Sequence, residues 1–538
     1  MATSTQEMHD RLEKPMSRFF LAHTKAELYK EARKRDVQLT PVNTPGDVLE
    51  DIQLRSRAFW TELEHPELAA TITYPGSFAK MSITPCGVSR RAPLIGEHNR
   101  EIYEKESGLS NKQIDAFKPK LPRIDSSCSK IERSMPTQAL EGVKVVDFSW
   151  VLVGPLMVKY LADHGATVIH IESSTRIDNA RSSAPRKPGT PNANTSGMFA
   201  YINSNKYSIS LNLKNPEGLR IARKLIAWGD VVVDNFSPGS MAKWGLAYED
   251  IIKIKSDIIM MQCSMLGQTG PRAKDRGYGI GLTGLAGLTH LTGWPDRGPM
   301  PPFGAYTDFI ACIFGATALI SALDFRRRTG KGQYIDLSQY EAAEHFSAAA
   351  VLDYVINGRE GTRMGNRCDY AAPHAAYRCH GDDRWCAIAT FTDDEWEAFC
   401  QVIGNPEWTR NPRFSTLIAR KENEAELDRL VEEWTVNHSA EEIMDLMQSK
   451  GVPAGVVQTG EDLLNDPQLK HRDYFWWLNH SELGPFPHLG QPFKLSKAPA
   501  QARMPSPCLG EHTEMVCREI LGMSDEEFLG LLNAGAFE

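Results

Sequence analysis

The sequence has none of the marks of several common protein classes. Its ten cysteines form no CxxC pair, it contains no GxxxxGKS or GxxxxGKT loop, and its first twenty residues contain no signal-like apolar run. We therefore expect no disulfide framework, no P-loop nucleotide site and no export, and the irregularly spaced thiols suit a cytoplasmic location. Four potential zinc ligands lie close together, but their spacing lacks the paired steps of a zinc site, so we expect no metal; they are His374, Cys379, His380 and Cys386.

Long apolar runs and a strong net charge are also missing. The longest apolar stretch, residues 311–323, falls short of the ~20 residues that span a bilayer, so it predicts a buried helix and no membrane anchor. A net charge of -8 gives no general attraction for nucleic acid. An anionic ligand must therefore be bound by local Lys and Arg side chains.

The length and an internal repeat divide the chain. A chain of 538 residues exceeds the ~250–300 residues that one hydrophobic core serves, which predicts several domains. Residues 51–68 match residues 466–483 at eight of eighteen positions, including Arg57 with Arg472. We interpret the first residues as an N-terminal copy of the C-terminal tail. The predicted map is 1–118 for this N-terminal copy, 119–138 for a Pro- and Ser-rich linker, 139–345 for a large domain, 346–455 for a small domain and 456–538 for the C-terminal tail.

Short β-branched runs alternate with helical segments after the linker. Such continuous apolar strands are typical of a parallel sheet covered on both faces. We expect a doubly wound, Rossmann-like α/β large domain, followed by a smaller α+β domain and a tail that returns to a large domain. The expected strands are residues 143–148, 167–172, 207–213, 230–236 and 257–264.

Two motifs within the large domain invite a functional interpretation. Residues 279–284 satisfy GxGxxG, but no strand precedes them, so we expect a small-residue helix face packed on a neighbour and no dinucleotide site. Asp308 follows a Gly-containing loop at the start of an apolar helix. A carboxylate there can cap the helix, and it can also serve as a covalent nucleophile.

The chain resembles the family III CoA-transferases, which include formyl-CoA, carnitine and benzylsuccinate CoA-transferases. The resemblance runs from Leu140 to about Ala536 and rests on LEGVKVVDFSWVLVGP, NSNKYSISLNLKNPEG, DVVVDNFSPG, TGLAGLTHLTGWPD, GAYTDFIACIFGATALISAL and TGKGQYIDLSQYEA. It implies that Asp308 is the catalytic nucleophile, because this residue falls where the family keeps its aspartate. The implied reaction moves coenzyme A from an acyl-CoA to a free carboxylic acid, through aspartyl anhydride and aspartyl-CoA thioester intermediates.

The same resemblance implies where coenzyme A is bound. Relatives contact the nucleotide and pantetheine at positions that correspond to Val151, Val153, Leu211, Lys214, Asn235, Phe236, Lys243 and Arg276. Backbone near Gly304 or around Gly365 is expected to stabilise oxyanions. Relatives with formyl-CoA activity carry Gln at Leu152 and an acid at Gly279, which makes formyl or oxalate specificity doubtful here. The segment from residue 365 to 389 resembles the benzylsuccinate branch, which suggests a succinyl-CoA donor and a substituted dicarboxylate acceptor.

Partners and alternative functions follow from the resemblance as well. We expect no tightly bound cofactor and an interlocked homodimer, or a heterodimer with a related subunit, in which the N-terminal copy packs on an α/β domain and buries Phe59, Trp60 and Leu63. One alternative is a CoA-ester racemase or epimerase, but Tyr278 and Gly279 stand where such relatives have a histidine-aspartate pair. The other is a noncatalytic subunit of a CoA-transferase heteromer.

Overall fold

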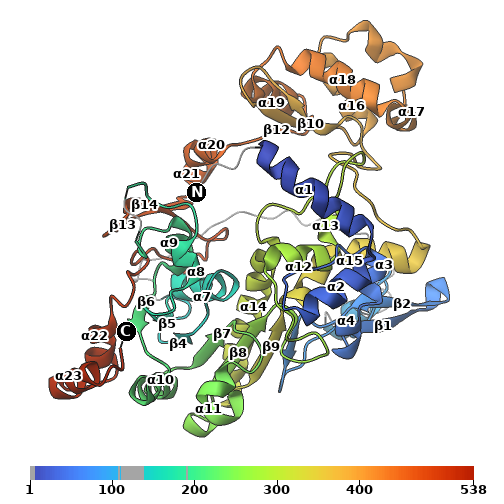
Figure 1. Cartoon of the computed structure of the whole chain (residues 1–538). Coiled ribbons are helices and arrows are strands. Elements are labelled where there is room, and N and C mark those ends of the chain that lie inside the picture. Colours follow the sequence, from blue (N-terminus) through green and yellow to red (C-terminus); the bar gives the residue numbers. More distant parts are fainter. Residues whose placement is uncertain (1–5, 107–109, 111–137, 190–191, 538) are drawn as a thin grey trace.

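The computed structural model describes residues 6–106, 110, 138–189 and 192–537 (Figure 1). Its central element is a seven-stranded sheet in the order β3-β9-β8-β7-β4-β5-β6. Neighbouring strands are parallel, except that β3 and β9 are antiparallel. The strands are β3 (Ala79–Met81), β4 (Lys144–Asp147), β5 (Thr167–Glu172), β6 (Tyr207–Ser210), β7 (Val231–Asp234), β8 (Ile259–Ser264) and β9 (Tyr334–Ser338). The predicted doubly wound α/β fold is confirmed.

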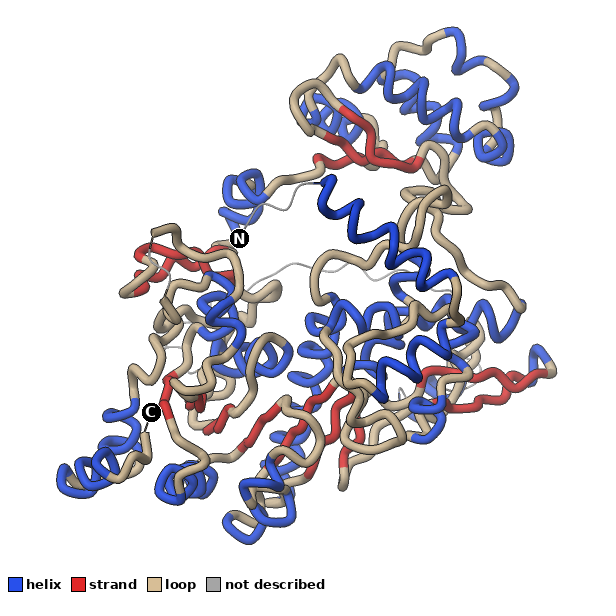
Figure 2. The backbone as a smooth tube through the Cα atoms, in the orientation of Figure 1, coloured by secondary structure: helices blue, strands red, loops and turns tan. Residues whose placement is uncertain are grey.

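Helices cover both faces of this sheet (Figure 2). Successive residues of a strand point to opposite sides, and here both sides are apolar, so both need a covering layer. In β4, Val145 packs into one core and Val146 into the other. The first core also contains residues of α7 (Val153–Asp163), α9 (Gly197–Asn203) and α14 (Tyr306–Thr329); the second contains residues of α10 (Pro216–Trp228), α11 (Tyr248–Ile254) and α23 (Asp525–Asn533).

The apolar stretch at residues 311–323, expected to form a buried helix, lies in α14. This helix packs along α7 and along α15 (Gln339–Asn357). Among the described residues it is the one helix long and apolar enough to cross a membrane, judged by length and composition, and half of that stretch is buried inside the protein. Its contacts with two neighbouring helices support the role of a core helix.

The small domain surrounds a three-stranded antiparallel sheet of β10 (His374–Arg378), β11 (Trp385–Ala389) and β12 (Ala454–Val456). Phe399, Leu427 and Ile443 are fully buried in its core. The helices are α16 (Asp393–Val402), η4 (Glu407–Arg410), η5 (Pro412–Phe414), α17 (Leu417–Glu422), α18 (Glu424–Thr435) and α19 (Ala440–Ser449). The predicted boundary at residues 345 and 346 falls inside α15, so this helix lies on both sides of it.

The N-terminal copy and the C-terminal tail share a series of elements in the same order, although η1 and β3 have no counterpart in the tail. Each has a β-hairpin, β1 with β2 and β13 with β14, and the equivalent residues Ala58 and Asp473 both have a left-handed φ of 50°. The matching elements are α3 (Pro45–Leu49) with α20 (Gly460–Asn465), α4 (Ile52–Ser56) with α21 (Pro467–His471), β1 (Trp60–His65) with β13 (Phe475–His480), β2 (Ala70–Pro75) with β14 (Gly484–Leu489), α5 (Asn99–Glu101) with α22 (Thr513–Met515), and η2 (Ile102–Glu106) with η6 (Val516–Ile520).

The correspondence extends further towards the N-terminus. α2 (Lys25–Lys34) matches α19, and both begin with a capping box, in which Thr24 pairs with Glu27 and Ser439 with Glu442. Upstream of α2, α1 (Gln6–Leu21) occupies the position of α18. The N-terminal copy therefore repeats the end of the small domain as well as the tail.

The N-terminal copy packs on the α/β domain of its own chain. Phe59 and Leu63 are buried and Trp60 is half-buried. Phe59 shares a core with Leu282 of α12 (Gly279–Leu285) and with Tyr340 of α15. The remaining short elements are η1 (Pro66–Leu68), α8 (Asn179–Ser182), η3 (Met241–Trp244) and α13 (Leu288–Leu291). The predicted linker, residues 119–138, lies outside the described residues except at its last position.

Candidate active site

Asp308 lies in the first turn of α14. The helix begins after Ala305, and Asp308 is its third residue, with its backbone N–H donating to the Ala305 carbonyl at 3.0 Å. The cap position therefore belongs to Ala305, and the side chain of Asp308 does not cap the helix. The carboxylate is left for another task.

The carboxyl group of Asp308 is buried but not satisfied. The residue is 9% exposed, and within the described part of the chain its Oδ2 has no hydrogen-bond partner. Burial penalises the charged form and raises the pKa of Asp308 to about 7. A buried carboxylate oxygen without a hydrogen-bond partner is costly to keep, which marks this position as a candidate functional site.

Gly279 provides the space that this carboxyl group occupies. A Cβ atom at Gly279 would lie 2.0 Å from Asp308 Oδ2 and 2.8 Å from Ala305 Cβ. The Gly279 carbonyl accepts hydrogen bonds from Thr283 Oγ1 of the same helix at 2.7 Å and from Thr307 Oγ1 of α14 at 3.2 Å, and the second bond joins α12 to the start of α14. The small-residue packing expected for residues 279–284 is confirmed, and its first glycine faces the candidate nucleophile.

A cavity of about 290 Å³ opens beside the carboxyl ends of the central strands. Four of the predicted CoA-binding residues line it, Leu211, Lys214, Phe236 and Lys243. Leu211 is buried, whereas Lys214 and Lys243 are exposed. An apolar wall with cations at the rim suits a ligand that combines an aromatic ring with phosphates.

Three further predicted residues build the turn between β4 and α7 beside this cavity. Val151 has a φ of 70°, and its N–H donates to the Asp178 carboxylate at 3.0 Å. Asn235 is fixed against Trp150, accepting from its N–H at 2.8 Å and donating to its carbonyl at 2.6 Å. Val153 is buried at the first position of α7. These residues shape the cavity's edge and are not among its lining residues.

Arg276 lies elsewhere. Its side chain is exposed and forms an ion pair with Asp36 at 2.7 Å, beside α2 of the N-terminal copy. The structure therefore does not bring Arg276 together with the other predicted CoA-binding residues. Trp150 and Arg176 line the cavity instead, with the Arg176 guanidinium 5.7 Å from the Trp150 ring centroid. In the sequence, the position of Trp150 directly before Val151 could have indicated that this side chain lines the cavity.

The turn between β4 and α7 connects the cavity with the helix that carries Asp308. Trp150 lines the cavity, while Leu152 and Val153 share a core with Ile310 and Ala311 of α14. The long contact between α7 and α14 fixes the first turns of both helices. The cavity and Asp308 thus belong to one rigid assembly, which suits a ligand that must present its reactive end repeatedly to one group.

The two segments expected to stabilise oxyanions differ. Gly304 lies directly before the cap of α14 with a φ of 67°, adjacent in sequence to the turn that carries Asp308. The N–H of Gly365 donates to the Gly293 carbonyl at 2.8 Å, so this donor is already occupied. Gly304 is therefore the better placed of the two.

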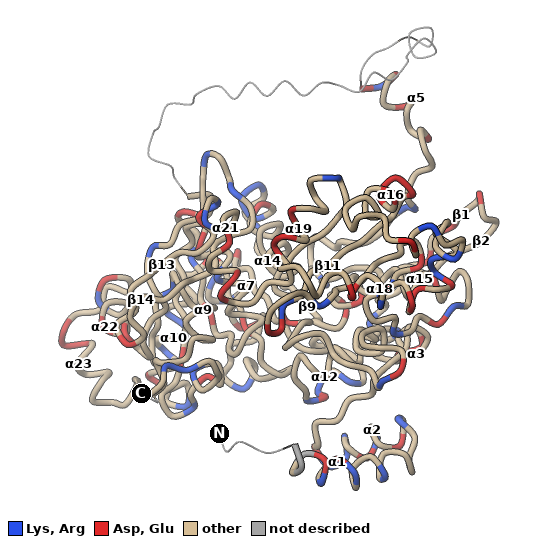
Figure 3. The backbone as a smooth tube through the Cα atoms, turned by 90° about the horizontal axis from the view of Figure 1, so that it is seen from above, with Lys and Arg blue, Asp and Glu red and all other residues tan. Residues whose placement is uncertain are grey.

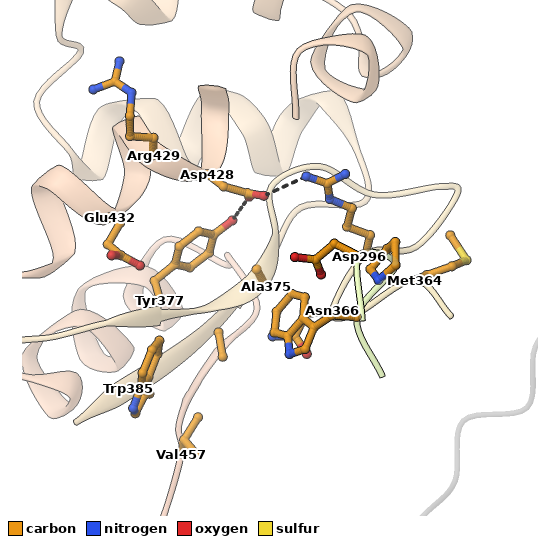
Figure 4. Close-up of a pocket in the computed structure, with 14 residues that line it drawn as sticks. Asp296, Met364, Asn366, Ala375, Tyr377, Trp385, Asp428, Arg429, Glu432 and Val457 are labelled. Atoms are coloured by element: carbon orange, nitrogen blue, oxygen red, sulfur yellow. Dashed lines mark hydrogen bonds and ion pairs between the residues drawn. The ribbon is translucent and has the colours of Figure 1, made fainter. Parts of the chain in front are cut away.

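Another cavity, of about 850 Å³, lies between the small domain and the segments that join it to the α/β domain. In Figure 4 the side chain of Tyr377, from β10, points to Asp428 of α18. Tyr377 Oη donates to Asp428 at 2.8 Å, and an Arg367 nitrogen lies 4.0 Å from it. The charged groups of this cavity are thus partly neutralised by one another. Neither Asp308 nor any predicted CoA-binding residue lines the cavity.

Possible metal ligands do not cluster in the described part of the chain, where no group of three or more His, Cys, Asp or Glu side chains is arranged to hold an ion. The four residues considered for zinc lie in and around the β10–β11 hairpin. Cys379 and Cys386 are buried there in the small-domain core.

Comparisons with known proteins identify the family. The profile described as CoA-transferase family III matches residues 1–99 and 140–513. A succinyl-CoA–D-citramalate CoA-transferase of Chloroflexus aurantiacus is 32% identical over 400 residues, covering 74% of this chain and 98% of that protein. The succinyl-CoA–L-malate CoA-transferase beta subunit of the same organism is 31% identical over 398 residues, covering 73% and 96%.

Solved structures give the same result. A CAIB/BAIF family protein from Brucella suis superposes with a TM-score of 0.67 at 32% identity, over 71% of this chain and 100% of the other. The profile match, the relatives and the shared fold lead to one conclusion, which is that this chain belongs to the family III CoA-transferases.

Proposed function

We propose that this CoA-transferase uses Asp308 as a covalent nucleophile. The observation that carries the proposal is the buried Asp308 carboxyl with an unpartnered oxygen at the start of α14. A partly desolvated carboxylate is a better nucleophile than a hydrated one, because it has fewer hydrogen bonds to break before it attacks.

The proposed cycle has four acyl transfers. An Asp308 oxygen attacks the thioester carbon of the donor acyl-CoA, the C–S bond breaks, and a mixed anhydride and CoA thiolate form. The thiolate then attacks the Asp308 carbonyl carbon, which releases the donor acid and leaves an aspartyl-CoA thioester. The acceptor carboxylate attacks that thioester, and the freed thiolate finally attacks the acceptor carbonyl of the second anhydride. Asp308 is regenerated as a carboxylate, and no proton or electron is gained or lost overall.

The residues that line the cavity have a defined part in this cycle. The cavity of Leu211 and Phe236, with Lys214 and Lys243 at its rim, holds the nucleotide end of coenzyme A. The thiolate therefore stays beside Asp308 between steps, and binding energy from the remote nucleotide serves the reacting centre. No tightly bound cofactor is needed, because coenzyme A is a substrate.

The substrates are proposed from relatives and from sequence. The two curated relatives are named for succinyl-CoA and for the substituted dicarboxylates citramalate and malate. We propose a succinyl-CoA donor and a substituted dicarboxylate acceptor for this chain. We also propose a cytoplasmic location and an interlocked dimer with an identical or related subunit; one relative is named as a beta subunit.

A substrate panel with a nucleophile variant tests the proposal. The chain is incubated with succinyl-CoA and a set of free dicarboxylic acids, and new CoA esters are identified by mass spectrometry. Asp308→Ala should abolish every transfer while the affinity for coenzyme A, measured by calorimetry, stays close to that of the wild type. Transfer by Asp308→Ala at the wild-type rate would move the nucleophile elsewhere.

A further inference from the structure

The N-terminal copy is anchored on the α/β domain by an arginine that enters a pair of carboxylates. Arg57 donates to Asp336 at 2.7 Å and to Glu341 at 2.6 and 3.0 Å, and its side chain is 0% exposed. We call Asp336 and Glu341 the carboxylate pocket. Gln53, also fully buried, donates to the carbonyls of Leu266 and Thr269 at 2.7 and 2.8 Å.

Apolar packing and strand pairing complete this docking. Val48, Leu54 and Phe59 are buried against α12 and the start of α15. Residues 79–81 form β3, which pairs with the outer edge of β9. Charge, apolar area and backbone hydrogen bonds thus all fix the N-terminal copy in one place on its own chain.

The C-terminal tail carries the same groups, but they are not engaged. Arg472 corresponds to Arg57, yet no carboxylate of the described residues lies within ion-pair distance, and its guanidinium donates to the Pro492 carbonyl at 3.1 Å. Gln468, the counterpart of Gln53, is exposed. Residues 493–495 correspond to β3 but form no strand, and Phe493 and Leu495 are 50% and 40% exposed.

An apolar hollow marks the same face of the C-terminal tail. It measures about 530 Å³, and its wall includes Leu463, Leu464, Leu469 and Tyr474. The equivalent residues of the N-terminal copy, Val48, Leu49, Leu54 and Phe59, cover α12 and α15, and three of them are fully buried. The tail therefore presents an apolar and cationic surface of the kind that, in the N-terminal copy, fills a carboxylate pocket.

We propose that the C-terminal tail docks on a second α/β unit of this family, through Arg472 in a carboxylate pocket that is vacant in that unit. The pocket of this chain is already filled by Arg57, so an identical chain in the same state offers no place for the tail. A pair of buried carboxylates without a cation is strongly destabilising, so an arginine that enters the vacant pocket stabilises that unit.

The helix α1 leaves a second face of the N-terminal copy uncovered. Figure 3 shows α1 standing off the body of the molecule. Leu12 and Met16 of α1 are 60% and 55% exposed, whereas their counterparts Leu427 and Val431 of α18 are fully buried in the small-domain core.

The test combines the full chain with a probe that has a vacant pocket. The probe is residues 139–538 carrying Arg472→Ala, so it lacks the N-terminal copy and its own tail lacks the docking arginine. A chain of about this extent is expected to fold, because the Brucella suis relative is matched over its whole length by 71% of this chain. We expect native mass spectrometry to show a 1:1 complex. Arg472→Ala in the full chain should weaken it at least about 30-fold by calorimetry, and the exposed neighbour Lys470→Ala should not.

Three outcomes overturn the proposal. They are no complex with a folded probe, a complex indifferent to Arg472→Ala, and a wild-type dimer that Arg472→Ala dissolves, since the last would place the tail on an identical chain. If the probe does not fold, the full chain carrying Gln53→Ala, Arg57→Ala and Phe59→Ala, which removes the buried anchors of the N-terminal copy, should release this copy and self-associate, and Arg472→Ala should abolish the self-association. A triple variant that stays monomeric although limited proteolysis shows its N-terminal copy released contradicts the proposal. This inference builds on the proposed pairing of two units and not on the reaction, so Asp308→Ala should leave every complex intact.

Discussion

Asp308 and Asp234 are two buried carboxyl groups that share one property and differ in another. Burial raises the pKa of each to about 7. Asp234, at the end of β7, is 0% exposed and accepts from Gln262 Nε2 at 3.0 Å and from the Phe236 N–H at 3.1 Å. Asp308 has an oxygen with no described partner. A raised pKa therefore reports burial, and the unpartnered oxygen is what distinguishes Asp308, the proposed nucleophile, from Asp234.

The largest expected difference comes from the matched variants Asp308→Asn and Asp234→Asn. Removing the nucleophile should lower kcat by about 10⁴-fold or more. The Asp234 variant keeps its shape and most hydrogen bonds, so kcat should fall less than about tenfold. Steady-state assays of both variants check the comparison, and equal losses would erase the distinction between the two carboxyls.

Gly279→Ala should have the next largest effect. Its Cβ would overlap Asp308 Oδ2, so the carboxyl or α12 must move, and we expect kcat to fall about 100-fold because small misplacements of a reacting group are costly. Gly530→Ala in α23 is the control, because a Cβ there meets nothing within 4 Å. A Gly279→Ala enzyme with normal kcat would show that the carboxyl does not need this space.

The pH dependence should follow the ionisation of Asp308. Only the carboxylate form attacks, and its pKa is raised to about 7, so kcat/KM should rise with pH through about 7 and then level off. Asp234→Asn should leave this profile in place, since Asp234 is not the titrating nucleophile. A profile that is flat between pH 5 and 8 would contradict the assignment.

The smallest expected effects concern coenzyme A binding. Lys214→Ala and Lys243→Ala should each weaken it, by a few-fold, and the loss should be larger at low salt because screening is weaker there. Arg276→Ala should have no effect, because this side chain pairs with Asp36 away from the cavity. Calorimetry at two salt concentrations measures both, and a large loss for Arg276→Ala would relocate the binding site.

The sequence predicts much of the fold because local periodicity carries it. The strands near residues 145, 169 and 232 lie where apolar runs predict them, and the repeat predicts the second hairpin. Asp308 is ambiguous by spacing alone, and only the family resemblance separates cap from nucleophile. The pairing of β3 with β9 and the contact of Arg57 with Glu341 join residues more than 250 positions apart, so no local pattern reveals them.

The position of Arg276 illustrates the same limit. Its number in the sequence matches a family contact, but the N-terminal copy places Asp36 beside it. Trp150, by contrast, lines the cavity because the β4–α7 turn aims it there. Contacts that depend on the added N-terminal copy are the ones that family resemblance could not predict.

Trapping of the covalent intermediate tests the central claim most directly. The wild-type chain is incubated with succinyl-CoA, treated with borohydride or hydroxylamine, digested and mapped by mass spectrometry. The modification should appear at Asp308, in the peptide that contains the start of α14, and should be absent from Asp308→Asn. A modification at Asp234 or any other residue in an enzyme that turns over would contradict the account.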